Sequence, residues 1–171
     1  MTGVNMVADP EDRIPTDENV RDLCEELAAA AGRTSFTVAT AESLTAGNLA
    51  GHLGRATASG DWYCGGVIAY RKEVKHRLLA VSEGPVVSEA AAKAMASAVA
   101  ELMGADFALA VTGEAGPETQ EEVPPGTVWF GIYDRGEVRS QHRHFVGDPP
   151  DILAKTIETG VELILAAVGR R

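Results

Sequence analysis

The sequence has few cysteines, few aromatic residues and no long hydrophobic run. Its two cysteines, Cys24 and Cys64, lie in separate apolar patterns without a CxxC pair. They therefore indicate no disulfide framework, and we expect two buried thiols in a reducing cytoplasm. No apolar stretch approaches the roughly 20 residues that cross a bilayer, and the N-terminus lacks the apolar centre of a secretory signal. These absences predict a cytoplasmic protein without a membrane segment.

Positive charge is also scarce. The chain carries 15 Lys and Arg residues against 25 Asp and Glu residues, which gives a formal net charge of −10. This charge repels a phosphate backbone, so we do not expect a nucleic-acid-binding protein. A small anionic ligand stays compatible with the sequence, because a local site can be positive on an acidic protein.

What is present is the composition of an ordinary globular domain. The 171 residues are 45% hydrophobic and 23% charged, which suits one domain with a sizeable core. Residues 1–15 show no periodic pattern and are expected to form a flexible arm, which leaves residues 16–171 for the domain. The sequence contains no internal repeat and no central linker.

Hydrophobic periodicity predicts an alternation of helices and strands that ends in a hairpin and a helix. Helices are expected from Thr16 or Asp17 to about Ala31, from the turn at Ser43 to about Leu53, over 71–79, from Ser88 to Gly104, and from Asp148 onward; strands are expected over 36–40, 62–70, 106–111, 127–133 and 138–145. The order predicts the α/β class, with a single domain in three α/β/α layers, a mixed sheet and a C-terminal β-hairpin plus helix. Gly160 within the last helix predicts a close packing contact.

Residues 37–50 are the centre of this organisation. They pass from a β-branched apolar segment through small polar residues into a helical pattern, so Ser43 and Thr45 are expected where a helix begins. A hydroxyl in that place can cap the helix, contact a phosphate or act as a nucleophile. On this stretch alone, Ser43 as a cap is as good an interpretation as Ser43 as a functional residue.

Three loops are expected to meet at the carboxyl ends of the apolar strands, over 41–47, 70–75 and 112–117. A lysine can act as a base when burial lowers its pKa, and a tyrosine can relay a proton, so Tyr70 and Lys75 are candidates to activate Ser43. The alternative for this pair is a hydrogen-bonded phenol and a solvated amine.

Backbone N–H groups add two further candidate subsites. Those of Leu44 and Thr45 are placed to form an oxyanion hole at the helix start. The turn over 113–116 is glycine-rich and can cradle a phosphate or a sugar, although Gly-x-x-Gly alone is a weak signal. Glu42 is either an orienting partner for a lysine or a simple first-turn carboxylate.

Metal binding finds little support. His142 and His144 lie two residues apart on one strand face, but no carboxylate or thiol spacing accompanies them. A solvated strand face is the favoured interpretation of this pair. We expect no metal and no cofactor.

Five ordered motifs resemble those of the CinA C-terminal domain family. They are Ala41-Glu42-Ser43-x-Thr45-x-Gly47, Gly66-x-x-x-Tyr70-x-x-Glu73-x-Lys75, Val87-Ser88-Glu89, Gly113-x-Ala115-Gly116-Pro117 and Pro125-Gly126-Thr127-Val128-Trp129. The resemblance covers roughly residue 18 to the C-terminus. It is similar to the stand-alone form of the family, without the larger nucleotide-pyrophosphatase-like domain that precedes this domain in full-length members.

The resemblance implies an activity and a site. The expected reaction is metal-independent hydrolysis of the carboxamide of nicotinamide mononucleotide to nicotinic acid mononucleotide and ammonia, in pyridine nucleotide salvage. Ser43 would be the nucleophile, and Tyr70 and Lys75 would activate it. Substrate contacts are expected from Glu42, Leu44, Thr45, Lys72, Thr112, Gly113, Ala115 and Gly116. A homo-oligomer is also expected.

The sequence departs from the family pattern at several positions. Leu44 stands where cysteine is usual, Ala46 for glycine, Lys72 for asparagine, Glu114 for an aliphatic residue, and Pro149 for arginine. Lys72 is expected to lower the pKa of Lys75 by charge repulsion. Added acid and missing arginine oppose phosphate binding, so two alternatives stay open: a catalytically silent homologue that binds a nucleotide or a partner, and an amidase for another small amide.

Overall fold

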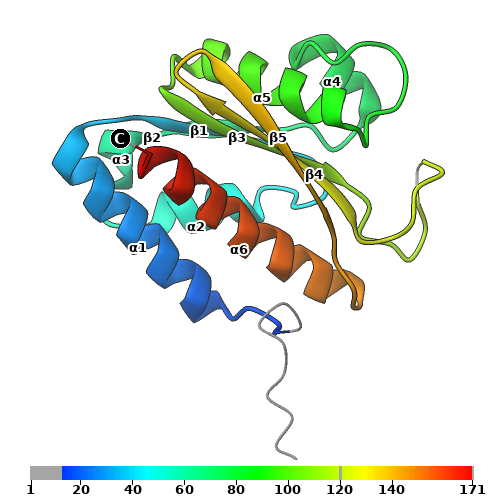
Figure 1. Ribbon diagram of the computed structural model, residues 1–171, viewed down its shortest axis with the longest axis horizontal. Helices are drawn as coiled ribbons and strands as arrows, with labels where there is room; N and C mark the ends of the chain where they lie inside the picture. The colour runs from blue at the N-terminus through cyan, green and yellow to red at the C-terminus, as the bar shows by residue number, and fades with distance from the viewer. Residues whose placement is uncertain (1–12, 120, 171) are drawn as a thin grey trace, which may run out of the picture.

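The computed structural model describes residues 13–119 and 121–170 (Figure 1). The helices are α1 (Asp17–Thr34), α2 (Asn48–Arg55), α3 (Ser59–Trp62), α4 (Lys72–Leu78), α5 (Glu89–Met103) and α6 (Pro149–Val168); the strands are β1 (Val38–Glu42), β2 (Tyr63–Ile68), β3 (Phe107–Gly113), β4 (Thr127–Asp134) and β5 (Glu137–His144). Most of the predicted flexible arm, residues 1–12, lies outside the described residues. Within them, no helix has the length and apolar character needed to cross a membrane.

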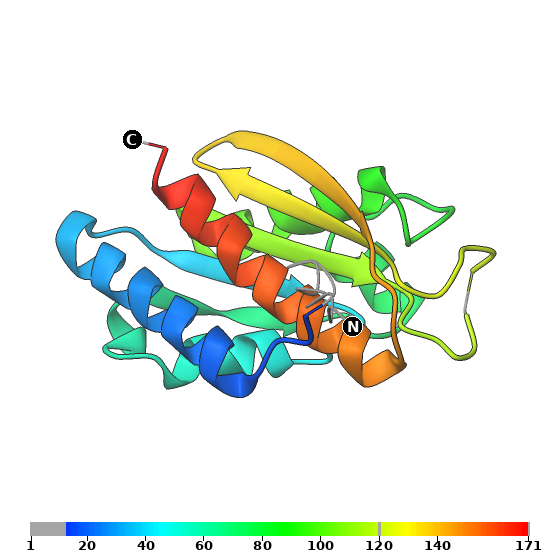
Figure 2. The same ribbon diagram turned by 60° about the horizontal axis from the view of Figure 1, so that its bottom comes forward.

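The strands form one mixed sheet in the order β2-β1-β3-β4-β5. Strand β1 is parallel to both of its neighbours, whereas β3 and β4 are antiparallel and β4 and β5 form the predicted hairpin. Helices α1, α2 and α6 cover one face, and α4 and α5 cover the other (Figures 1 and 2). The predicted α/β class and three-layer arrangement are confirmed.

The two faces of the sheet differ in side-chain size. Phe107, Leu109 and Val111 of β3 join the core beneath α1, α2 and α6, while Ala108 and Ala110 face the alanine-rich helix α5. Successive side chains of a strand point to opposite faces, so one short apolar run supplies both cores. Small side chains let α5 approach closely: a Cβ added at Gly131 would lie 2.0 Å from the carbonyl oxygen of Ala92.

Several predicted details are confirmed by the packing. Thr16 caps α1, Ser88 caps α5 through the backbone N–H of Ala91, and Gly104 ends α5 in the left-handed conformation. The close contact predicted at Gly160 is present, because a Cβ there would lie 2.9 Å from the side chain of Leu109.

Other details were wrong. Helix α1 continues three residues past Ala31 and through Gly32, where it was expected to end. It ends before Ser35, whose left-handed backbone conformation terminates the helix. The predicted strand over 62–70 starts only at Tyr63, because residues 59–62 form the single-turn helix α3. Cys24 is buried as expected, but Cys64 is exposed, since it lies on the edge strand β2.

Candidate active site

The site lies at the point where the chain changes sides of the sheet. From β1 the chain crosses to β2 through α2 on one face, and from β2 it crosses to β3 through α5 on the other. The connections that leave the carboxyl ends of β1 and β2 therefore run to opposite faces of the sheet, and such a point opens a crevice in α/β sheets. Ser43 follows β1 directly and Glu114 follows β3 directly, so each lies at this crevice.

A cleft of about 200 Å³ occupies this position. The three predicted loops all contribute to it, together with the segment before α5 and the start of α6. Its lining residues are Ser43, Leu44, Tyr70, Lys75, Val86, Val87, Gly113, Glu114, Ala115, Gly116, Glu118, Pro149 and Leu153. The structure therefore brings Ser43, Tyr70 and Lys75 to one cavity, as the loop positions predicted.

Glu42 determines how the loop after β1 is built. Its side chain is 1% exposed, and its Oε2 accepts hydrogen bonds from Thr45 Oγ1 at 2.7 Å and from the N–H groups of Gly47 and Leu49 at 2.9 and 3.2 Å. Oε1 accepts from the N–H of Ala50 at 2.7 Å. A carboxylate from the end of the strand thus caps the positive end of α2. Glu42 does not line the cleft.

The predicted order of strand, turn and helix is present, but Ser43 and Thr45 lie in the turn and not at the helix start where they were expected. The helix begins at Asn48 and residues 43–47 form a turn, with the N–H of Ser43 bonded to the carbonyl of Val111 at 3.0 Å. The interpretation of Ser43 as a helix cap is therefore excluded, since Glu42 fills that role. Within the described part of the chain, the Ser43 hydroxyl has no hydrogen-bond partner, although the residue is only 6% exposed and lines the cleft.

Lys75 projects from α4 into the same cleft and is 2% exposed. Burial lowers the pKa of its ammonium, because a charged amine loses water there, while the carboxylates of Glu121, Glu114 and Glu73 act in the opposite direction. The predicted repulsion from Lys72 is not among the causes of the shift. The lowered pKa and its cause in burial agree with the prediction, and only the added contribution of Lys72 was wrong.

Three hydrogen bonds hold the part of the cleft wall that precedes α5. The carboxylate of Glu121 accepts from the N–H groups of Val86 and Val87 at 2.7 and 2.8 Å, and Thr112 Oγ1 donates to the carbonyl of Val86 at 2.6 Å. These bonds fasten the segment before α5 to β3 and to the loop that follows it. Thr112 therefore supports the cleft wall without lining the cavity.

The Gly113–Gly116 turn approaches the neighbouring strand closely. A Cβ at Gly113 would lie 2.6 Å from the carbonyl oxygen of Thr127, and Gly116 has a φ of +78°. The N–H of Gly126 donates to the carbonyl of Glu114 at 2.7 Å and closes the loop. Glycine is required at these two positions by close approach and by backbone conformation, respectively.

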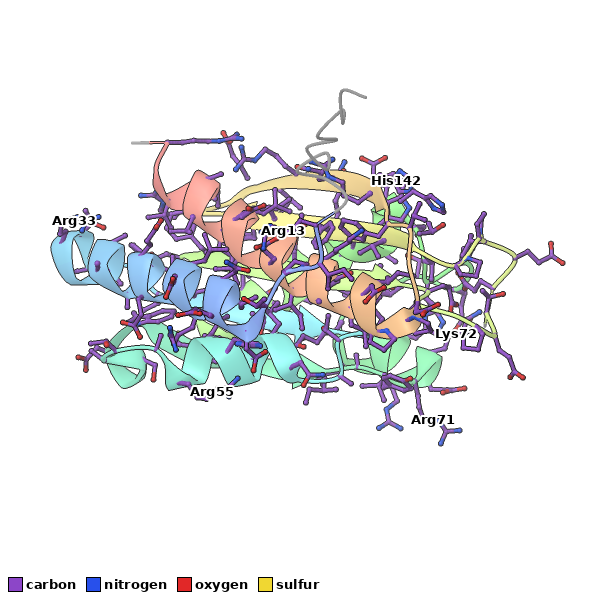
Figure 3. All side chains as sticks on the ribbon, turned by 90° about the horizontal axis from the view of Figure 1, so that it is seen from below. Arg13, Arg33, Arg55, Arg71, Lys72 and His142 are labelled. Atoms are coloured by element: carbon purple, nitrogen blue, oxygen red, sulfur yellow. The ribbon has the colours of Figure 1, made fainter. Side chains whose placement is uncertain are left out.

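The remaining predicted substrate contacts divide into two groups. Leu44, Gly113, Ala115 and Gly116 line the cleft, whereas Thr45 and Lys72 do not. Thr45 is fully buried against Glu42, and Lys72 is exposed on the first turn of α4. Figure 3 shows Lys72 at the end of the molecule where α6 begins.

Sequence reasoning missed part of the lining. Val86 and Val87 precede the predicted helix from Ser88, and Leu153 lies within the predicted last helix, so nothing in their spacing marks them as cleft residues. Glu121 was missed as well, because it lies more than thirty residues from Val86 and Val87 in the chain.

No group of three or more His, Cys, Asp or Glu side chains in the described residues is placed to hold a metal ion. His142 and His144 are exposed on β5, and the ring of His142 packs on Trp129 with 4.7 Å between ring centres. This contact agrees with the interpretation of the pair as part of a solvated strand face.

Comparisons with known proteins agree with this architecture. The chain is 39% identical over 133 residues to a putative competence-damage inducible protein of Levilactobacillus brevis. The aligned residues make up 74% of this chain and 32% of that protein. It spans about a third of the length of the curated relatives it matches.

Solved structures match over nearly their whole length. The competence damage-inducible protein A of Klebsiella pneumoniae superposes with a TM-score of 0.82 at 35% identity, covering 85% of this chain and 94% of that one. A competence or damage-inducible protein of Enterobacter asburiae gives 0.84 at 30% identity, covering 88% and 98%. A family model described as the CinA C-terminal domain matches residues 20–168. The chain belongs to the CinA C-terminal domain family.

Proposed function

We propose that this protein is a metal-independent serine amidohydrolase that acts on the carboxamide of nicotinamide mononucleotide. The main observation behind this proposal is that Ser43 and Lys75 line the same cleft and are both nearly fully buried. Glu42 caps α2, so the hydroxyl of Ser43 is not used as a helix cap. A serine becomes a nucleophile only when a base removes its proton. A buried lysine with a lowered pKa suits that role at moderate pH.

The reaction follows from these positions. Lys75 Nζ takes the proton of Ser43 Oγ as the oxygen attacks the carboxamide carbon, and the backbone N–H groups of Leu44 and Thr45 receive the resulting oxyanion. Neither N–H group donates a hydrogen bond within the described part of the chain. The C–N bond then breaks as the Lys75 ammonium returns the proton to the leaving nitrogen, and ammonia departs. Lys75 then deprotonates a water molecule that attacks the Ser43 ester, and the C–Oγ bond breaks as the Lys75 ammonium returns the proton to Ser43 Oγ, which releases the carboxylic acid.

The structure favours Lys75 over Tyr70 as the base. Tyr70 lines the rim of the cleft but is 55% exposed, so its phenol is open to water. Lys75 is removed from water, and its neutral form is correspondingly stabilised. We assign Tyr70 to contact with the substrate or to proton relay at the rim.

The test is ammonia release from nicotinamide mononucleotide with and without EDTA. We expect turnover that resists EDTA and that falls by at least about a thousandfold in Ser43→Ala. Ser59→Ala is the matched control, because Ser59 starts α3 outside the cleft and its hydroxyl bonds only the carbonyl of Gly54. Unchanged activity in Ser43→Ala would reject Ser43 as the nucleophile. Binding without turnover in the wild type would instead indicate a silent binding protein.

A further inference from the structure

The backbone N–H groups at the helix starts near the cleft, where an anion could bind, are already occupied by the chain itself, and the proposed reaction uses those of Leu44 and Thr45 for the oxyanion. Helix N-termini and loop N–H groups are the usual protein sites for phosphate, because their donors point outward and the helix dipole favours negative charge. Three such groups of donors lie at or near this cleft: the segment before α5 and the start of α6, which contribute to its lining, and the start of α2, which follows the turn of Ser43 and Leu44. The group that accepts from each set of N–H donors decides whether that set is free to bind a substrate phosphate.

Carboxylates of the protein itself bind two of these groups of donors. The buried Glu42 accepts from the N–H groups at the start of α2, those of Gly47, Leu49 and Ala50. The half-buried Glu121 accepts from the N–H groups of Val86 and Val87 at 2.7 and 2.8 Å. A phosphate would have to displace a charged acceptor of the protein at either place, which leaves that carboxylate without its partners.

The start of α6 offers no donor at all. Pro149 and Pro150 have no N–H, and the N–H groups of Asp151 and Ile152 both donate to the carbonyl of Asp148, at 2.9 and 3.1 Å. The Asp151 carboxylate accepts from the N–H of Asp148 at 3.3 Å, so two acidic side chains stand at this helix end. Pro149 lines the cleft, and the helix end beside it is closed to anions.

The charges of the side chains that line the cleft also disfavour a phosphate. Among the described residues that line it, Lys75 is the one cation, while Glu114 and Glu118 are acidic. Lys75 is required as a neutral base in the proposed reaction and so is not a phosphate partner. The N–H groups of Ala115 and Gly116 lie between Glu114 and Glu118 in the chain, where neutral hydroxyls are better tolerated than a dianion.

We infer that the cleft recognises the ribosylated pyridinium carboxamide of its substrate and not the phosphate. This inference rests on the proposed hydrolysis at Ser43 and narrows its substrate class. The nucleoside, nicotinamide riboside, carries the pyridinium cation without the phosphate charges, and it matches the acidic lining better than the mononucleotide does. The protein prefers the nucleoside, or treats the two alike, in both binding and turnover.

The test compares the two ligands in binding and in turnover. Calorimetric titration of Ser43→Ala measures dissociation constants without hydrolysis, and ammonia release by the wild type measures kcat/KM. We expect the nucleoside to be equal or superior in both, and we expect added salt to improve mononucleotide turnover, because salt screens charge repulsion. Tenfold tighter binding of the mononucleotide, or failure of both ligands to bind, would overturn the inference. Inorganic phosphate as a competitive inhibitor at a few millimolar would do the same.

Charge variants at the rim test the cause. Glu118→Lys should raise mononucleotide turnover relative to the nucleoside, whereas Glu122→Lys, exposed in the same loop but outside the cleft lining, should leave that ratio unchanged. Lys72 is an exposed cation at this end of the molecule but does not line the cleft, so Lys72→Met should affect both substrates alike (Figure 3). A selective loss of mononucleotide turnover in Lys72→Met would place the phosphate at that ammonium and refute the inference.

The failures of the two proposals are distinguishable. If the wild type hydrolyses the mononucleotide and rejects the nucleoside, the preference is refuted and the amidohydrolase stands. If Ser43→Ala binds the nucleoside more tightly but the wild type releases no ammonia from either ligand, the hydrolysis is refuted and the ligand preference stands.

Discussion

Replacing Glu42 by glutamine tests whether the carboxylate at the end of β1 stabilises the turn that contains Ser43 and caps α2. Glutamine has nearly the same shape, so the change removes charge and one acceptor without creating a cavity. Three donors converge on Oε2 and one on Oε1. If the amide oxygen takes the Oε2 position, the amide NH₂ faces the N–H of Ala50, and two donors oppose each other.

The magnitude follows from these contacts. Hydrogen bonds to a charged group contribute about 1.5 to 3 kcal/mol each, and a buried N–H without an acceptor costs about 1 to 3 kcal/mol. Relief of the desolvation of the buried carboxylate offsets part of this loss. We expect a net loss of about 2 to 4 kcal/mol in the free energy of unfolding, which lowers Tm by roughly 5 to 15 °C for a domain of this size.

Urea denaturation of the wild type and Glu42→Gln at equal protein concentration measures this loss as a shift of the midpoint. Glu18→Gln is the matched control, since the Glu18 side chain is 74% exposed on the first turn of α1 and should change stability by less than about 0.5 kcal/mol. A Glu42→Gln midpoint that coincides with that of the control would refute the capping argument.

Three further predictions concern other parts of the molecule. The rate of amide hydrolysis should rise with pH and level off below the ordinary pKa of a lysine, because burial lowers the pKa of Lys75 and its neutral form is the base; a flat pH profile would contradict this role. Burial raises the pKa of the Cys24 thiol to about 12, so the folded state holds this proton more tightly and stability should fall as pH rises from 9 toward 12; Cys24→Ala should flatten that slope in denaturation at several pH values. Gly131→Ala should lower the free energy of unfolding by more than about 2 kcal/mol, since its Cβ would overlap the carbonyl of Ala92. Gly51→Ala has open space in α2 and should instead raise it by about 0.5 to 1 kcal/mol. Thermal melts of the two variants and the wild type test both expectations.

Elements with strong local signals could be predicted from the sequence. The apolar run before Thr112 predicted β3, and the turn residues Arg135 and Gly136 predicted the hairpin. Ser88 and Gly104 predicted the two ends of α5. In each case the chemistry that sets the boundary lies within the segment itself. The convergence of three loops at the carboxyl ends of the strands was predictable for the same reason, because alternating helices and strands leave few topologies.

Boundaries that depend on contacts between segments were not predictable in this way. Gly32 was expected to end α1, but a single interior glycine costs only about 1 kcal/mol and the packing of α1 against α6 exceeds that cost. The cleft wall at Val86 and Val87 depends on Glu121, more than thirty residues away in the chain. No local pattern records such a contact.

The adjacent residues Glu42 and Ser43 show how the fold separates two roles that the sequence left combined. Either residue type can accept N–H groups at a helix start, so this stretch of sequence alone left Ser43 open between a cap and a functional residue. The alternation of strand side chains continues to the end of β1, and it directs Glu42 to the interior beneath α2 while Ser43 reaches the cleft. Because the stronger acceptor occupies the interior position, the helix is capped without the serine. The hydroxyl of Ser43 is thereby left in the cleft that Lys75 also lines.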